Sequence, residues 1–189
     1  MMNVQTIKGE GVIRLKSFAR LYHLPVIERT TRRKIGLLSD VYVKKESGEL
    51  IAVEVTNENI LYRKRLFYAK DIVRETPGYL LVQGFGERYA AVLPDGVQSA
   101  KSYRREIYNK KAMRGSEVLG KIKDCAFDFE TGQMEEIEVG KGIAEDLLNG
   151  RTRLLLSDGI SVRGGSVDVH CENRVIPSQK GIRNIMKGE

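Results

Sequence analysis

Residues 35–55, IGLLSDVYVKKESGELIAVEV, decide the fold, because the chain repeats this stretch as LGKIKDCAFDFETGQMEEIEV at residues 119–139. The two stretches align without a gap, at a constant offset of 84, and six of the 21 aligned positions are identical. A period of this length is too long for a solenoid repeat and has the size of a small domain. Because two such units nearly fill the 189 residues, the sequence indicates duplication of one domain.

Each copy of the repeat has the pattern of a β-hairpin. Apolar side chains alternate with polar ones, as at Val41 and Val43, and a period of two places them on one face of a sheet. Gly48 and Gly132 supply the positive φ that a short hairpin loop commonly needs. Further short strands are expected at residues 65–69, 79–83, 88–93, 153–157, 160–163 and 166–171. Strands this short, with turns this frequent, predict a mostly β protein made of small barrels or sandwiches.

Two short helices and four regions complete the predicted organisation. Residues 17–24 form one expected helix, with Ser17 as N-cap, and residues 143–149 form another that ends at Gly150. We expect a first barrel over residues 1–100, a basic linker over 101–114, a second barrel over 115–176 and a tail over 177–189.

Composition excludes several classes of protein. The longest strongly apolar runs have about four residues, whereas a membrane-spanning helix needs about 20, so none is expected. Residues 1–16 lack the apolar core of a signal peptide, and we expect a cytoplasmic protein. Two cysteines are too few for a disulfide framework or a Cys-only zinc site. Two histidines argue against His-based metal or acid–base chemistry, and we predict no metal and no cofactor.

Positive charge is concentrated in the first half and the linker. The chain has 32 basic and 25 acidic residues, a net charge of +7, and residues 1–94 account for +6 of it. Such a surface suits nucleic acid, an anionic membrane or an acidic protein, but it is also typical of a solvated face. The candidate partner-binding residues are Arg29, Arg32, Arg33, Lys34, Arg63, Lys64, Arg65, Lys101, Arg104 and Arg105. Aromatic residues interleave with the middle group, a pattern that also suits contact with RNA.

The repeat resembles a PRC-barrel domain. The resemblance rests on Gly36 and Asp40 spaced as Gly-x-x-x-Asp, the Ser-Gly turn and the strand after it, all recurring around Gly120 and Asp124. It covers about 150 of the 189 residues and implies a tandem of two small PRC-type β-barrels with short helices. The stretch 144–151 is also similar to small bacterial PRC-barrel proteins linked to sporulation.

The resemblance implies a docking role. In the reaction-centre H subunit such a barrel packs under a membrane complex and assists proton delivery, and in RimM-type factors it binds a ribosomal protein. We therefore expect a non-enzymatic adaptor that binds a protein or ribonucleoprotein assembly. Direct RNA binding in ribosome assembly is one alternative, and a proton-relay or enzyme-associated subunit using carboxylates between Asp124 and Glu138 is another. A homodimer is possible, because small barrels leave edge strands.

Other residue clusters favour structural roles. Asp40 and Asp124 are expected to accept backbone N–H bonds. Asp168 and His170 share a strand face while Cys171 points the other way, which opposes a metal or nucleophile site there. Gly84-Phe85-Gly86 and Gly164-Gly165 lack the remainder of a phosphate-binding motif and are interpreted as turns.

Overall fold

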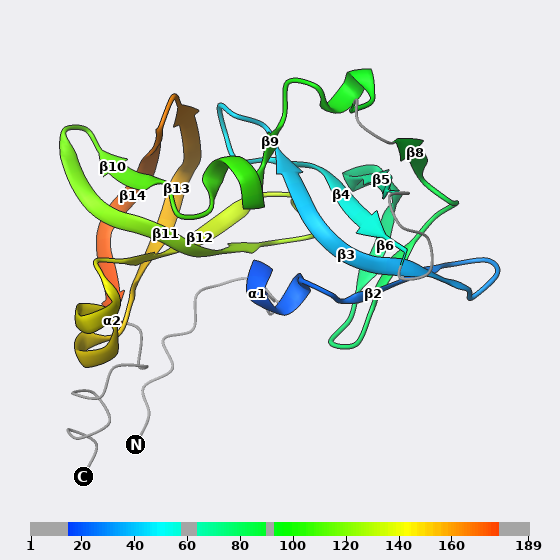
Figure 1. The fold of residues 1–189 in the computed structure, drawn as a ribbon, viewed down its shortest axis with the longest axis horizontal. Helices are drawn as coiled ribbons and strands as arrows, with labels where there is room; N and C mark the ends of the chain where they lie inside the picture. Colours follow the sequence, from blue (N-terminus) through cyan, green and yellow to red (C-terminus); the bar gives the residue numbers. More distant parts are fainter. Residues whose placement is uncertain (1–14, 58–63, 90–92, 178–189) are drawn as a thin grey trace, which may run out of the picture.

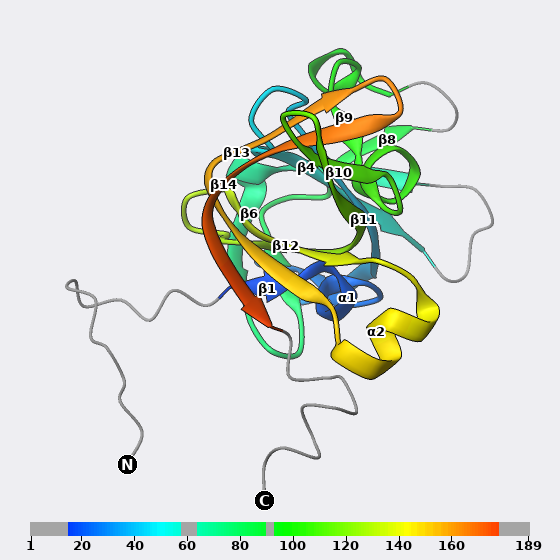
Figure 2. The same cartoon turned by 90° about the vertical axis from the view of Figure 1, so that its left-hand side faces the viewer.

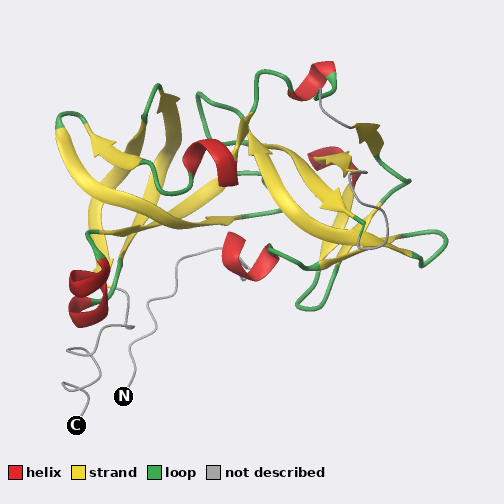
Figure 3. Ribbon diagram, in the orientation of Figure 1, coloured by secondary structure: helices red, strands yellow, loops and turns green. Residues whose placement is uncertain are grey.

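Strands dominate the protein, as Figure 3 shows in yellow. The structure is a computed structural model that describes residues 15–57, 64–89 and 93–177. The elements of the first half are β1 (Lys16–Ser17), α1 (Phe18–Leu21), β2 (Pro25–Glu28), β3 (Lys34–Val43), β4 (Leu50–Thr56), β5 (Lys64–Tyr68), a 3₁₀ turn (Ala69–Asp71), β6 (Ile72–Glu75), β7 (Leu80–Val82), β8 (Glu87–Tyr89) and a second 3₁₀ turn (Asp95–Val97). The remaining elements are β9 (Lys101–Ser102), a π-helix (Tyr103–Ile107), β10 (Lys111–Arg114), β11 (Glu117–Phe127), β12 (Met134–Gly140), α2 (Ile143–Asn149), β13 (Thr152–Arg163) and β14 (Ser166–Pro177).

The second half is a closed barrel of five strands. The strands follow the order β11-β10-β14-β13-β12, and β12 pairs again with β11 to close the ring (Figure 2). The neighbours β10 and β14 are parallel, with Ala112 opposite Val167. Ile122, Ile137 and Val167 are fully buried inside this half, which gives the barrel its core.

The first half is an open sheet, so the expectation of two closed barrels is wrong for this half. Its strands follow the order β6-β7-β2-β3-β4-β5-β8. It matches the barrel strand for strand from β2 to β4, including a parallel pair, β2 and β7, that corresponds to β10 and β14. The halves differ at the strand that should join β4 to β7.

A broken strand explains the open sheet. In the second half, the long strand β13 pairs with both β12 and β14 and absorbs an irregularity between Leu156 and Ile160. In the first half, a 3₁₀ turn divides the corresponding segment into β5, which pairs with β4, and β6, which pairs with β7. Asp71 stabilises this turn by accepting a 3.1 Å hydrogen bond from the Tyr68 N–H. The ladder is therefore interrupted where the barrel would close.

One hydrophobic core joins the two halves. Buried residues of both sheets, including Val41 and Cys125, belong to the same contiguous cluster. The two repeat hairpins also touch, since the Leu50 N–H donates to the Gly132 carbonyl oxygen at 2.7 Å. β13 approaches the first hairpin as well, where the Val162 N–H donates to the Lys45 carbonyl oxygen at 2.7 Å. Figure 1 shows β3 and β11 reaching toward each other across this junction.

Several local predictions can be compared with these elements. The helix at residues 143–149 is confirmed, and Gly150 follows it with a φ of 76°. The helix expected at residues 17–24 is shorter, Phe18–Leu21. The strands expected at 153–157 and 160–163 form one continuous strand. Residues 101–114, expected as a linker, contain β9, the π-helix and β10. The expected strand at 88–93 lies partly outside the described residues, and the tail lies outside them from residue 178 onward.

Candidate functional site

One group of the expected binding residues lies on the loop between β2 and β3 and at the first residue of β3. Arg29, Arg32, Arg33 and Lys34 are all exposed there. Glu28 organises this loop, since its carboxylate accepts hydrogen bonds from the N–H groups of Thr30 and Thr31 at 3.0 and 2.6 Å. The structure therefore presents this basic group on an ordered hairpin, at the end of the molecule opposite α2 (Figure 1).

These hydrogen bonds predict a pH dependence of stability. Backbone N–H bonds from Thr30 and Thr31 lower the pKa of Glu28 from 4.5 to about 2. Because the folded pKa is depressed, the Glu28 contribution is present above pH 4.5 and is lost as the pH falls toward about 2. We expect Glu28→Gln to lower the urea midpoint near neutral pH but to have little effect near pH 2. A difference that stays constant over this range would contradict the assignment.

The other described candidates hold the fold together. Lys64 pairs with Glu54 at 3.1 Å, and Lys101 pairs with Glu106 at 2.8 Å. Arg65 donates to the Phe85 carbonyl oxygen at 2.6 Å. Arg63 lies outside the described residues. The charged groups of Lys64, Arg65 and Lys101 therefore already take part in ion pairs or hydrogen bonds within the protein.

Arg104 and Arg105 also form contacts within the protein. The Arg104 guanidinium lies over the Tyr22 ring, 4.4 Å from its centroid, and donates to the Ser39 carbonyl oxygen at 3.2 Å. Arg105 donates to the Tyr42 hydroxyl and, at 3.2 Å, to Ser102 Oγ. Both arginines hold residues 101–107 against the first sheet.

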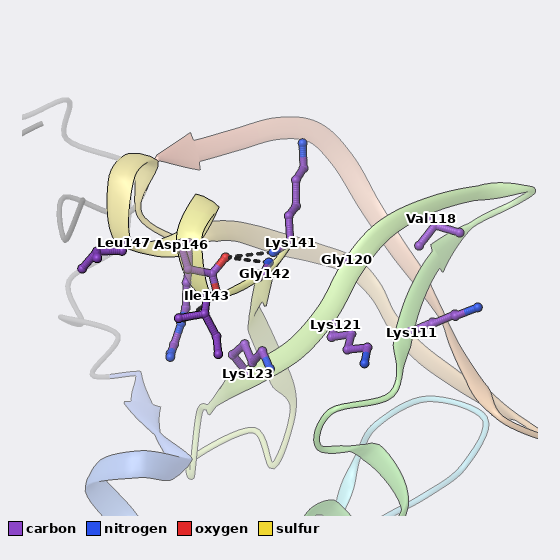
Figure 4. Close-up of a pocket in the computed structure, with 12 residues that line it drawn as sticks. Lys111, Val118, Gly120, Lys121, Lys123, Lys141, Gly142, Ile143, Asp146 and Leu147 are labelled. Atoms are coloured by element: carbon purple, nitrogen blue, oxygen red, sulfur yellow. Dashed lines mark hydrogen bonds and ion pairs between the residues drawn. The ribbon is translucent and has the colours of Figure 1, made fainter. Parts of the chain in front are cut away.

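A groove of about 790 Å³ on the second half brings together a different set of basic residues (Figure 4). Its walls are β10 and β11 on one side and the segment from the end of β12 into α2 on the other. The lining residues are Lys111, Val118, Gly120, Lys121, Lys123, Gly140, Lys141, Gly142, Ile143, Asp146, Leu147 and Arg151. Five of these are cationic and only Asp146 is acidic. Because Lys141 lies 3.8 Å from Glu145 and Arg151 pairs with Glu138, the excess positive charge lies on the wall formed by β10 and β11.

Strand register places three lysines on one wall. Lys111 on β10 lies directly opposite Lys121 on β11, and cross-strand partners project from the same face of a sheet. Lys123 lies two positions further along β11 and donates to Asn109 Oδ1 at 2.9 Å. Among the residues that the structure describes, Lys111 and Lys121 form no ion pair. Like charges directly opposite each other destabilise a sheet, so this pair is costly for the fold.

The acidic groups near the groove are already engaged. Asp146 accepts hydrogen bonds from the N–H groups of Lys141 at 2.8 Å and Gly142 at 3.3 Å, drawn as dashed lines in Figure 4. Arg151 pairs with Glu138 at 3.0 Å and lies 3.8 Å from Asp146. The carboxylates therefore hold the start of α2 and do not neutralise the lysines of the opposite wall.

Exposed aliphatic side chains complete the groove. Ile143 is 92% exposed, Leu147 is 58% exposed and Val118 is 55% exposed. Ile143 and Leu147 are spaced i, i+4 on α2 and so lie on one face of the helix. A groove of this kind can hold a negatively charged group and an apolar side chain at the same time.

The equivalent aspartates Asp40, which is buried, and Asp124, which is half-buried, have the structural role expected of them. Asp40 accepts hydrogen bonds from the N–H groups of Val41 and Arg104 at 2.8 and 3.1 Å. Asp124 accepts from the N–H groups of Cys125 and Ala19 at 2.9 and 3.2 Å. Burial raises the pKa of both carboxyl groups.

The Asp168, His170 and Cys171 cluster is divided between different surroundings. Asp168 pairs with Arg163 at 3.2 Å, His170 is exposed and Cys171 is half-buried. Within the described ranges, no three His, Cys, Asp or Glu side chains are placed to hold a metal ion.

Sequence reasoning missed the groove because its cations are scattered. Lys121 and Lys123 alternate along one strand, while Lys141 and Arg151 flank a helix that comes after the next strand of the chain. The alternation of lysine with apolar residues in LGKIKD was the available signal, and it is weaker than a run of adjacent charges.

No protein-family model matches the chain, and no curated protein matches it either. In the described part of the chain, none of the helices has the length and apolar character needed to cross a membrane.

Proposed function

We propose that the protein is a non-enzymatic adaptor that docks onto a protein or ribonucleoprotein assembly, and that the groove beside α2 holds an acidic segment of a protein partner. The PRC-barrel resemblance supports an adaptor role. The shared strand order of the two halves supports the duplication on which that resemblance partly rests.

The facing pair Lys111 and Lys121 is the observation that carries the proposal. Two cations held opposite each other repel, and bringing a carboxylate between them would relieve that repulsion. On the opposite wall of the groove, Ile143 exposes aliphatic surface that would gain about 25 cal/mol for each Å² it buries. Both features favour a partner with acidic side chains flanking an aliphatic one.

The residues that line the groove favour a protein partner over an RNA partner. Single-stranded RNA is usually held by aromatic rings that stack on bases. The described residues that line the groove include no aromatic side chain. Lysines alone would bind phosphates without regard to the bases, and such binding weakens steeply as salt increases.

A double variant tests the groove. We expect Lys111→Gln/Lys121→Gln to weaken binding of a fluorescein-labelled Glu-Glu-Leu-Leu-Glu-Glu peptide about tenfold, which corresponds to about 1.4 kcal/mol. Fluorescence anisotropy measures this affinity, and urea unfolding checks that the variant is folded. We expect no loss of stability, because the substitutions remove a repulsion.

Arg32→Gln/Arg33→Gln is the matched control, since it removes the same charge from the other basic surface. Equal losses in the two variants would show general charge attraction and would argue against the groove. Tighter binding of an oligouridylate than of the peptide would favour the RNA alternative.

A pull-down from cell extract tests the adaptor role itself. The proposal predicts a partner that the unaltered protein retains after nuclease treatment and that Lys111→Gln/Lys121→Gln loses. A partner that disappears with nuclease would point to RNA, and retention by the double variant would exclude the groove as its site.

A further inference from the structure

Two short arms cross between the halves of the molecule. We define the N-terminal arm as residues 16–24 and the central arm as residues 101–110. The N-terminal arm precedes β2 of the first half, yet its strand β1 pairs with β11 of the second half. The central arm precedes β10 of the second half, yet its strand β9 pairs with β3 of the first half.

The two arms bind in the same register. Ser102 lies opposite Tyr42, and Ser17 lies opposite Ala126. Tyr42 and Ala126 are equivalent positions of the sequence repeat. Each arm begins with Lys-Ser followed by an aromatic residue. The two arms therefore place similar residues, Lys-Ser-aromatic, at equivalent positions of the two sheets.

Equivalent aspartates bind the two arms. Asp40 accepts hydrogen bonds from Ser102 Oγ at 2.5 Å and from the Arg104 N–H at 3.1 Å. Asp124 accepts the Ala19 N–H at 3.2 Å, and the Ser17 side chain lies near enough to favour the charged form of its carboxyl group. In both cases the aspartate accepts the backbone N–H at the second position after the serine.

The arms also leave their sites in the same way. His23 and Asn109 both have positive φ, 67° and 64°, at the turn that ends each arm. Their N–H groups donate to the carbonyl oxygens of Leu38 and Ile122, at 2.8 Å in both halves. The helix between the serine and this turn differs in length by one residue between the two arms, with four residues in α1 and five in the π-helix. The wider π turn absorbs the extra residue without changing the register at either end.

Equivalent side chains meet where the arms approach each other. Phe18 and Tyr103 follow Ser17 and Ser102, and their ring centroids are 4.6 Å apart. Contact between equivalent positions is the signature of a two-fold axis. A cavity of about 580 Å³ at this point is lined by both members of four equivalent pairs, Phe18 and Tyr103, Ala19 and Arg104, Tyr22 and Tyr108, and Asp40 and Asp124.

We infer that the chain is a fused, arm-exchanged dimer, in which each half carries a binding site for the arm of the other half. The ligand of each site is a short strand and turn of sequence Lys-Ser-aromatic, supplied by a second copy of the repeat. Apart from the aromatic residue that follows the serine, the two arms are interchangeable ligands of the two sites.

An arm transplant in the full-length chain tests this inference. Residues 19–22 are replaced by Arg-Arg-Glu-Ile-Tyr, the sequence of residues 104–108, so that the N-terminal arm receives the central arm's turn. Phe18 is retained, because the Tyr103 side chain lies beside Cys125 and the equivalent position in the first half is Val41. The control carries the same inserted residues in scrambled order.

We expect the transplant to unfold in urea at a midpoint close to that of the unaltered chain, and well above that of the scrambled control. Asp124→Ala should shift the midpoint equally in the unaltered chain and in the transplant. Cross-strand NOEs between residue 17 and Ala126 should be present in both. A transplant no more stable than the scrambled control, or one insensitive to Asp124→Ala, would overturn the inference.

Discussion

The substitution Phe18→Ala is expected to lower the free energy of unfolding by about 3–5 kcal/mol, the range for removing a buried phenylalanine side chain. Phe18 is 7% exposed and packs against the Tyr103 ring of the other half as well as the Tyr22 ring of its own arm. Truncation leaves a cavity between the two halves. This cavity is costly because neither sheet can move inward to fill it without breaking its pairing with an arm.

Urea denaturation followed by circular dichroism measures this loss. The control is Arg20→Ala, which removes an exposed side chain from the same helix and should change stability by less than about 0.5 kcal/mol. We expect both halves to unfold in one transition, because one buried cluster spans them. A Phe18→Ala variant that loses no more stability than Arg20→Ala would show that the contact with Tyr103 contributes little.

Local patterns in the sequence predict the hairpins and the second helix well. The period of two and the turn glycines locate β3, β4, β11 and β12, because apolar and polar residues alternate along these strands and short loops join them. Helix α2 is predictable because Gly150 marks its end. These features depend on close neighbours along the chain, which a single sequence displays directly.

Closure of the first half could not be predicted in the same way. Asp71 sits in a segment whose apolar pattern continues on both sides, and nothing there distinguishes a 3₁₀ turn from the bulge that β13 tolerates. The turn depends on a hydrogen bond between Asp71 and the Tyr68 N–H. Comparison of the two repeats does not reveal this local interaction, which lies where the ladder of the first half is interrupted.

The arms and the groove were missed because they are formed by residues far apart in sequence. Lys-Ser at 16–17 recurs at 101–102, but that spacing differs by one from the offset of the repeat, and a two-residue match carries little information by itself. The lysines of the groove converge only when β10 and β11 pair. The first basic group was identified readily because its charges are adjacent, and adjacency in sequence is a poor guide to convergence in space.

The substitution Asp40→Ala is expected to lower the free energy of unfolding by about 3 kcal/mol, because it leaves three donors without their acceptor in a buried site. Those donors are Ser102 Oγ and the N–H groups of Val41 and Arg104. The equivalent substitution Asp124→Ala should cost about 1–2 kcal/mol, since Asp124 is only half-buried and water can replace part of what is lost.

The pH dependence of the free energy of unfolding of the Asp40 variants separates the effect of the hydrogen bonds to Asp40 from the effect of its charge. Burial raises the pKa of Asp40 above 3.8, so the folded protein binds this proton more tightly than the unfolded chain does. The corresponding contribution to stability is fully present below pH 3.8 and is lost as the pH rises through the folded pKa. Asp40→Asn keeps a side-chain oxygen as an acceptor and removes the charge, so it should lose less stability than Asp40→Ala at neutral pH.

Urea unfolding of the unaltered chain, Asp40→Ala and Asp40→Asn at several pH values tests this argument. We expect the advantage of the unaltered chain over Asp40→Asn to shrink as the pH rises from about 3.8, because only the unaltered chain must bury a carboxylate. An advantage that grows with pH would mean that the donors around Asp40 stabilise its charge by more than burial opposes it. A small loss in Asp40→Ala would show that the first sheet holds the central arm through strand pairing and packing, with no need of the buried aspartate.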